Sequence, residues 1–287
     1  MPDAFIPSRP PGLLLATDLS ARCDRALERS KQLAQEFAVP IEVLTVVDAP
    51  HAPADVLAWF EGDTGREREA GAARLEFALE FEGSGLQASQ RVAAGQVDDA
   101  ILDAAAALPG WLVVTGASQD DTLGRLILGS TVERLARGLA QPLLAVRRRV
   151  RGPYRSILVP VDGSDAARRA LRLAAAMFPA RRIVVYDAAT DGQGQAVLDS
   201  FIDSCGLDAA ARANITALAA EGDAEAPPAA QSSTRSIARL TEFARTNAID
   251  LAVLGLHTEP ALVRLFSGSR SDHLLQDFAC DTLLVPP

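Results

Sequence analysis

The sequence predicts an α/β fold with two tandem, doubly wound parallel-sheet domains, over residues 1–150 and 151–287. Two observations predict it: short apolar runs alternate with longer segments of helical character, and one order of motifs occurs twice, about 140 residues apart. A repeat of this length has the size of a whole domain and is too long for a solenoid. We therefore interpret the chain as a duplicated domain.

The duplication is visible in two pairs of segments. Residues 116–130 align without a gap on residues 255–269, and both segments keep Gly, Leu, Arg, Leu, Gly and Ser in register. Earlier in each half, the Asp-x-Ser of residues 18–20 corresponds to the Asp-x-Ser of residues 162–164. The spacing between copies differs slightly for the two pairs, so the halves differ by a few residues of loop.

Five runs in each half have the apolar, β-branched composition of buried strands. In the first half they are residues 13–17, 41–47, 86–93, 111–116 and 142–147, and in the second residues 157–161, 182–187, 215–220, 251–255 and 282–286. Helical segments such as residues 25–38 separate them, and right-handed crossovers then require parallel sheets with helices on both faces. An open apolar edge strand is a liability, so we expect the last strands to pair in an internal pseudo-dimer.

Composition argues against several classes of function. The net charge of −9 disfavours nonspecific binding to nucleic acid or anionic lipid, because both need a basic surface. Lys31 is the only lysine and lies in no Walker A, kinase or Schiff-base motif. The three cysteines lack the spacing of zinc ligands, so we expect no metal. The one basic run, residues 147–151, is interpreted as a solvated linker in preference to an anion site.

The sequence contains no signal for a membrane. No apolar run approaches the roughly 18 residues that a membrane span needs, and the first residues lack the basic and apolar regions of a signal peptide. We therefore expect a soluble, cytoplasmic protein without a membrane or nucleic-acid partner.

The expected ligand site follows from the strand order of such a sheet. Ligands of an open α/β sheet bind beyond the carboxyl ends of the strands, where the strand order reverses. Asp18 and Asp162 are expected at the ends of the first strands, and Gly116 and Gly255 at the ends of the fourth strands. These residues therefore converge on one crevice in each half.

A glycine and a serine precede the last helix of each half, at residues 129–130 and 268–269. A helix N-terminus offers free N–H groups and partial positive charge, and a glycine lets a phosphate approach the backbone, so these pairs favour a phosphate-binding loop. The serines equally fit capping boxes with Glu133 and Asp272, and Ser164 fits an N-cap. The sequence leaves both interpretations open.

In this order of motifs the sequence resembles the universal stress protein family in its tandem two-domain, Rossmann-like form. Nucleotide-binding members of that family carry Gly-x2-Gly-x9-Gly-Ser/Thr after the fourth strand and Asp-x-Ser after the first. The matching segments here read Gly-x2-Gln-x9-Gly-Ser over residues 116–130 and Gly-x2-Thr-x9-Gly-Ser over residues 255–269. The resemblance covers both halves, over about residues 12–285.

The resemblance implies an adenine nucleotide, ATP or a relative, as a cofactor bound to one or both halves. The implied binding residues are Ala16, Thr17, Asp18, Val46, Gly116, Gln119, Gly129, Ser130 and Thr131 in the first half, and Asp162, Gly255, Thr258, Gly268 and Ser269 in the second. Val46 takes the position whose backbone holds adenine, and its counterpart in the second half is Asp187. The first half is therefore the expected binder.

Two departures from the family pattern favour a different function. Gln119 and Thr258 replace the middle glycine, which adds a side chain where the backbone approaches phosphate. Acidic residues follow, namely Asp120, Asp121 and Glu259, and they repel a polyphosphate. The alternative is a nucleotide-free interaction scaffold with degenerate phosphate loops.

The resemblance predicts a stress-response regulator in which bound nucleotide changes the affinity for a protein partner that the sequence does not identify. We assign no catalytic residue, because no His/Asp/Ser order recurs in both halves, and expect at most slow ATP hydrolysis. An enzyme of the wider adenine-nucleotide α/β superfamily is disfavoured, since HxGH-type and SGGxDS-type segments are absent. The duplication predicts a monomer or a small homo-oligomer.

Overall fold

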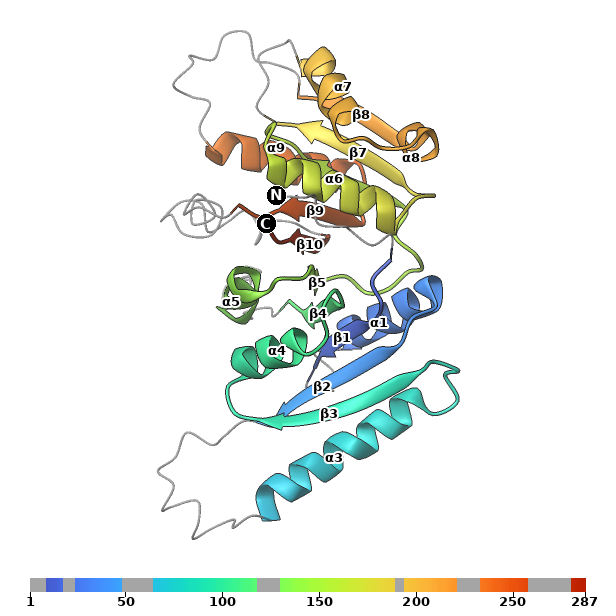
Figure 1. Cartoon of the computed structure of the whole chain (residues 1–287), viewed down its shortest axis with the longest axis vertical. Coiled ribbons are helices and arrows are strands. Elements are labelled where there is room, and N and C mark those ends of the chain that lie inside the picture. Colours follow the sequence, from blue (N-terminus) through green and yellow to red (C-terminus); the bar gives the residue numbers. More distant parts are fainter. Residues whose placement is uncertain are drawn as a thin grey trace.

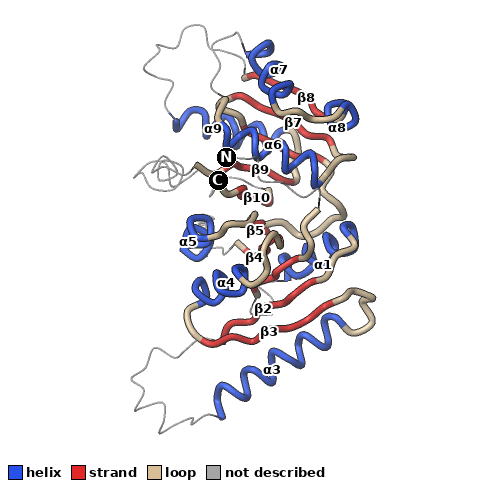
Figure 2. Tube along the Cα trace, in the orientation of Figure 1, coloured by secondary structure: helices blue, strands red, loops and turns tan. Residues whose placement is uncertain are grey.

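The computed structural model of the chain describes residues 9–17, 24–47, 64–117, 130–188, 194–220, 233–257 and 280–287. Its strands form one 10-stranded sheet with helices along both faces (Figures 1 and 2). The first half contains β1 (Leu13–Ala16), α1 (Asp24–Phe37), β2 (Ile41–Val47), α3 (Thr64–Phe81), β3 (Ala88–Ala94), α4 (Val97–Ala106), β4 (Leu112–Gly116), α5 (Ser130–Gly138) and β5 (Leu143–Val146). The second contains β6 (Ser156–Pro160), α6 (Asp165–Met177), β7 (Arg182–Asp187), α7 (Gly194–Ser204), α8 (Ala209–Ala213), β8 (Ile215–Ala219), α9 (Ser233–Thr246), β9 (Leu251–Gly255) and β10 (Asp281–Val285).

The strand order is β3-β2-β1-β4-β5-β10-β9-β6-β7-β8. Neighbouring strands within each half are parallel, and both halves repeat the same doubly wound order. The predicted fold class is therefore confirmed. The expected strands are also present, and their ends differ from the expectation by at most two residues.

The two halves join through their last strands. β5 and β10 pair antiparallel, with Leu283 opposite Leu144 and Leu284 opposite Leu143. All residues of both strands are buried, because helices cover both faces of the sheet and each strand covers the edge of the other. The prediction of an internal pseudo-dimer is confirmed.

The apolar core is continuous across this junction. One buried cluster on one face of the sheet includes residues of α1 and α3 from the first half and of α6 and α7 from the second. Within it the rings of Phe37 and Phe178 lie 5.8 Å apart. On the other face, Leu256 and Leu284 of the second half pack into a cluster with residues of α4 and α5. The domain boundary at residue 150 stays a prediction, since the core extends over both sides of it.

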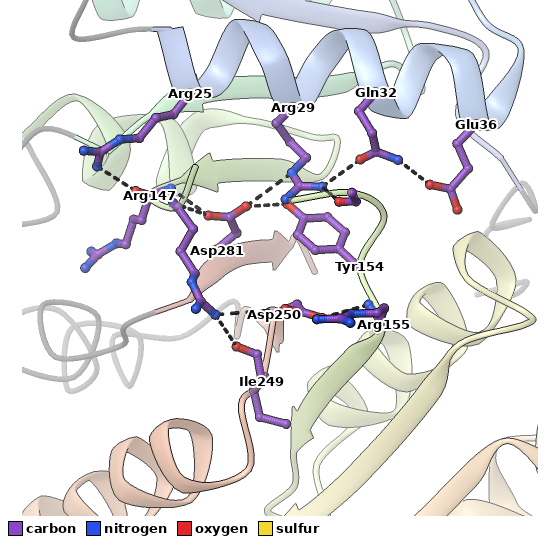
Figure 3. A network of polar contacts seen from close by, with 12 residues as sticks. Arg25, Arg29, Gln32, Glu36, Arg147, Tyr154, Arg155, Ile249, Asp250 and Asp281 are labelled. Atoms are coloured by element: carbon purple, nitrogen blue, oxygen red, sulfur yellow. Dashed lines mark hydrogen bonds and ion pairs between the residues drawn. The ribbon is translucent and has the colours of Figure 1, made fainter. Parts of the chain in front are cut away.

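The carboxylate of Asp281, at the start of β10, is the centre of a buried polar network at the junction (Figure 3). Its Oδ1 accepts the backbone N–H groups of Arg147 at 2.7 Å and Arg148 at 2.9 Å. Its Oδ2 accepts the hydroxyl of Tyr154 at 2.7 Å and lies 3.5 Å from Nε of Arg29. This carboxylate thus connects α1, the segment after β5 and the second half of the sheet.

Arg29 lies on the buried face of α1, where the helical pattern otherwise places apolar residues. Its guanidinium lies 3.9 Å from the centroid of the Tyr154 ring and donates to the carbonyl of Gly152 at 3.0 Å. It also donates to Gln32 at 2.7 Å. Because the positive charge is paired with Asp281 and stacked on an aromatic ring, burial of this arginine is tolerated.

The basic run of residues 147–151 differs from its expected role as a solvated linker. Arg147 is 5% exposed, and its backbone carbonyl accepts from Nη1 of Arg25 at 2.8 Å. Arg148, Arg149 and Arg151 are exposed. The interpretation is therefore wrong for Arg147, because the run begins directly after a central strand and Asp281 holds its backbone.

None of the described helices is long and apolar enough to cross a membrane.

Replacing Asp281 with alanine is expected to lower the free energy of unfolding by about 3–5 kcal/mol, because it leaves the Arg29 charge buried without its ion-pair partner and the Tyr154 hydroxyl buried without its acceptor. Urea denaturation measures this change. Asp203→Ala is the control, because that carboxylate is 74% exposed and its replacement costs about 0–1 kcal/mol. Equal effects of the two substitutions would contradict the role given to Asp281.

The stability of the protein is expected to fall at alkaline pH. Burial, together with the nearby Asp281 carboxylate, raises the pKa of the Cys280 thiol from 9.0 to about 12. The unfolded chain therefore loses this proton before the folded protein does. The associated stability is complete below pH 9 and declines as the pH rises towards 12.

The slope contributed by Cys280 is at most about 1.4 kcal/mol per pH unit. Urea denaturation at several pH values should give a shallower decline for Cys280→Ala than for the unmodified chain. Val285→Ala also removes buried apolar atoms from β10 but has no titrating group, so its slope should stay unchanged. If the free energy of unfolding of Cys280→Ala declines with pH as steeply as that of the unmodified chain, the Cys280 thiol does not contribute to the alkaline loss of stability.

Candidate functional site

The predicted crevice of the first half lies where β1 and β4 end side by side. Ala16 pairs with Thr115, so the next residues, Thr17 and Gly116, lie level with each other at the carboxyl edge. Thr17 is 7% exposed, and its N–H donates to the carbonyl of Leu44 at 3.0 Å. β1 ends two residues before Asp18, earlier than expected, whereas Gly116 is the last residue of β4 as predicted.

Val46 lies on the neighbouring strand, β2, near the same edge. It pairs with Ala93 of β3, and the half-buried side chains of both residues pack against the cluster formed with α4 and α5. The structure therefore brings four members of the predicted first site, Ala16, Thr17, Val46 and Gly116, to the ends of three adjacent strands.

An arginine links the last helix of the first half to the first turn of α4. Arg134 on α5 forms ion pairs with Asp98 at 2.5 Å and Asp99 at 3.3 Å, both in the first turn of α4. Ser130 is the first residue of α5 and Thr131 is half-buried in its first turn. Glu133, the expected partner of Ser130 in a capping box, accepts a hydrogen bond from Arg137.

The equivalent edge of the second half lies between β6 and β9. Leu158 pairs with Ala252, and continuing this register places Val161 level with Gly255. The pair corresponds to Thr17 and Gly116 in the first half. The two halves therefore keep the same register at the point where the strand order reverses, which is the expected location of a ligand site.

Asp162 follows this edge and forms a local turn. Its Oδ1 accepts the N–H of Ser164 at 3.0 Å, and the Ser164 hydroxyl accepts the N–H of Ala167 at 3.2 Å. Gly163, between them, has a φ of +78°, a conformation that favours glycine. Ser164 is thus the N-cap of α6, which confirms the capping interpretation of this serine.

The other oxygen of Asp162 faces a histidine from the neighbouring strand. Oδ2 of Asp162 lies 3.6 Å from Nε2 of His257, two residues after the end of β9. Both side chains are partly exposed, at 62% and 33%. The loops after the first and fourth strands of the second half therefore meet, as the sequence predicts, and they present one acid and one imidazole.

Gly255 has a structural reason to be glycine. A Cβ atom at this position would lie 2.0 Å from the carbonyl oxygen and 2.3 Å from the carbonyl carbon of Ala166. The first turn of α6 therefore packs directly on the backbone of β9. Close helix packing accounts for this residue without a ligand.

Arg169 on α6 is a residue of this edge that the sequence analysis missed. Its Nη2 donates to the carbonyl of Leu256 at 2.8 Å, and its Nε donates to the carbonyl of Pro286 at 3.3 Å. The guanidinium thereby binds the residues that follow both β9 and β10. Nothing in the helical spacing distinguishes this arginine from the others of α6, so no sequence signal identifies it.

The second half differs from the first at the position that corresponds to Val46. Asp187 is the last residue of β7 and pairs with Ala219. The preceding residue, Tyr186, stacks on Phe243 of α9 with ring centroids 4.1 Å apart. Burial raises the pKa of the Tyr186 hydroxyl. An acidic residue thus takes the place of the apolar side chain found in the first half.

Several predicted site residues lie outside the described part of the chain. They are Asp18, Gln119, Gly129, Thr258, Gly268 and Ser269, together with the acidic residues Asp120, Asp121 and Glu259. Their role in binding stays a prediction. Within the described residues no group of three His, Cys, Asp or Glu side chains is arranged to hold a metal ion.

Two parallel α/β units joined edge to edge, each with a reversal of strand order between its first and fourth strands, define a tandem protein of the doubly wound α/β class. The universal stress protein family, Usp, matches residues 12–147 and again residues 153–286. The chain therefore belongs to this family, and the resemblance stated from its motifs is confirmed. No curated protein sequence matches it at a significant level.

Solved structures of similar proteins agree with this assignment. A universal stress protein from Archaeoglobus fulgidus DSM 4304 has 18% identity and a TM-score of 0.72, with 98% of each chain covered. A functionally unknown protein from Pseudomonas aeruginosa PAO1 has 15% identity and a TM-score of 0.63, with 98% of this chain and 94% of that chain covered. A putative universal stress protein from Pseudomonas aeruginosa UCBPP-PA14 has 14% identity and a TM-score of 0.61, with the same coverage. At these identities the likeness shows the fold.

Replacing Gly255 with alanine is expected to destabilise the protein by several kcal/mol, because the new methyl group overlaps the backbone of Ala166. Thermal or urea denaturation in the absence of any ligand measures the effect. Gly71→Ala is the matched control, since α3 has no atom within 4 Å of the added methyl group and gains about 0.5–1 kcal/mol of helix propensity. A neutral Gly255→Ala would disprove the packing role.

Proposed function

We propose that the protein is a stress-response regulator that binds an adenine nucleotide, ATP or a relative, at the carboxyl edge of its first half. One observation carries the proposal: Thr17 and Gly116 lie level with each other on adjacent strands, at the point where the strand order reverses. The half-buried, apolar side chain of Val46 lies on the next strand. Backbone groups at such strand ends hold nucleotides in open α/β sheets. The family pattern over residues 116–130 supplies the expected phosphate loop.

The first half is favoured over the second for two physical reasons. Asp187 places a carboxylate where Val46 offers an apolar surface to a base. Asp162 already accepts one hydrogen bond from Ser164 and faces His257, so its oxygens are partly engaged before any ligand arrives. Nucleotide binding by the second half therefore requires these contacts to rearrange.

The regulatory part of the proposal rests on the connection between the halves. A nucleotide at the end of β1 and β4 lies beside β5, which is hydrogen-bonded to β10. We expect bound nucleotide to change the affinity for a protein partner, with at most slow ATP hydrolysis. The cytoplasmic location and the monomeric or small oligomeric state of the regulator stay predictions.

A nucleotide-free scaffold is the second candidate. Two observations in the second half favour it: the turn of Asp162 and Ser164 and the packing of Gly255 on α6 both account for family residues without a ligand. Gln119 and Thr258, in place of the family glycine, point the same way. In this function the fold presents a surface to a partner and binds no nucleotide.

Melting temperature in the presence of ATP separates the two candidates. At 100 times its dissociation constant, a bound ligand stabilises the folded state by about 2.7 kcal/mol, which raises the melting temperature by a few degrees for a chain of this size. Gly129→Leu, which places a side chain in the predicted phosphate loop, should abolish the shift. Gly268→Leu is the matched control and should preserve it.

Two results would contradict nucleotide binding by the first half. A shift that survives Gly129→Leu and vanishes with Gly268→Leu assigns the nucleotide to the second half. The absence of a shift with any adenine nucleotide in the unmodified chain rejects nucleotide binding and leaves the scaffold.

A further inference from the structure

A cavity of about 200 Å³ lies at the junction of the two halves, and none of its lining residues is a predicted nucleotide-binding residue. Its lining comes from α1, from the segment between β5 and β6, and from the residues before β9. The lining residues are Arg29, Arg148, Arg149, Arg151, Gly152, Pro153, Arg155, Ala248 and Asp250. Five arginines and one carboxylate therefore surround this space.

This charge distribution is unusual for the chain, whose net charge is −9. Within the described residues, the guanidinium groups of Arg149, Arg151 and Arg155 have no hydrogen-bond acceptor or ion-pair partner, and all three residues are exposed. Arginines gathered around one cavity repel each other, and a bound anion relieves the repulsion. An acidic protein has ample carboxylates with which such arginines could pair, but Arg149, Arg151 and Arg155 pair with none of those in the described part of the chain.

Hydrogen bonds connect the segments that line the cavity (Figure 3). Oδ2 of Asp250 accepts the N–H of Arg155 at 2.9 Å and of Ser156 at 3.2 Å. The guanidinium of Arg148 donates to the carbonyl of Ile249 at 3.1 Å. Together with the Asp281 network, these contacts fix the backbone on both sides of the segment that carries the arginines. Binding of an anion therefore requires little further ordering of the backbone.

We propose that this cavity binds a small polyanion with two or more phosphate groups, of which pyrophosphate is the simplest. Guanidinium groups bind phosphate oxygens through two parallel hydrogen bonds, and several of them around one space suit a multiply charged anion. The volume is below the roughly 300–1,000 Å³ of pockets for drug-sized ligands, which favours a compact ligand. Free pyrophosphate and the terminal phosphates of a nucleotide share this chemistry.

Binding in this place connects the two halves. Arg29 belongs to α1 of the first half, whereas Ala248 and Asp250 belong to the second. An anion held between them adds contacts across the junction, and it therefore raises the melting temperature of the whole chain.

Isothermal titration of the full chain with pyrophosphate tests the inference. The double variant Arg149→Gln and Arg151→Gln should weaken binding by about tenfold for each arginine that contacts the anion. Arg182→Gln is the control, because Arg182 is an exposed arginine at the start of β7, and it should leave binding unchanged. The affinity should also fall as the salt concentration rises.

Two results would overturn the inference. One is the absence of pyrophosphate binding by the unmodified chain at millimolar concentration. The other is binding that survives the double variant but disappears with Gly129→Leu, which would place the anion at the predicted phosphate loop.

Titration of ATP into a chain carrying both Gly129→Leu and Gly268→Leu distinguishes the source of the phosphates. If this double variant binds ATP and the arginine substitutions abolish that binding, a nucleotide is a ligand of the cavity. Binding of pyrophosphate alone identifies the free anion. Loss of pyrophosphate binding in the arginine variants supports the anion site whether or not the first half binds a nucleotide.

Discussion

A carboxylate that is fully removed from water is stable only when hydrogen-bond donors and opposite charge surround it, and the structure meets this condition at Asp281 with groups from three segments. The donors are the two backbone N–H groups that follow β5 and the Tyr154 hydroxyl, and the Arg29 guanidinium of α1 is the ion-pair partner at 3.5 Å. The arrangement specifies how the first half meets the second. The antiparallel pairing of β5 with β10 and the shared core depend on the same alignment.

The sequence predicts the sheet well because buried strands in a doubly wound fold are continuous apolar runs. Residues 41–47, 182–187 and 251–255 were expected as strands and form β2, β7 and β9 with the same bounds. Pairing of the last strands was also predictable, because an exposed edge as apolar as residues 143–146 is unfavourable. Local composition and the rule that apolar edge strands pair are therefore sufficient to predict the strands and the junction between the two halves.

The polar contacts could not be predicted in the same way, because they depend on where distant segments meet. Asp281 precedes an apolar strand, and nothing nearby indicates that its partners lie more than a hundred residues earlier. Arg29 looks like one of many helical arginines, although it is buried. At the candidate site, the sequence predicts that the loops of Asp162 and His257 converge. It does not predict the 3.6 Å contact between these two side chains or the packing of Gly255 on Ala166.

The central claim is that the duplicated halves form one cooperative unit, because the sheet, the core and the Asp281 network all cross the junction. Differential scanning calorimetry of the full chain without ligand tests this claim most directly. The account predicts a single transition whose calorimetric enthalpy equals its van't Hoff enthalpy. Two resolved transitions, or a calorimetric enthalpy about twice the van't Hoff value, would show that the halves unfold independently and would contradict it.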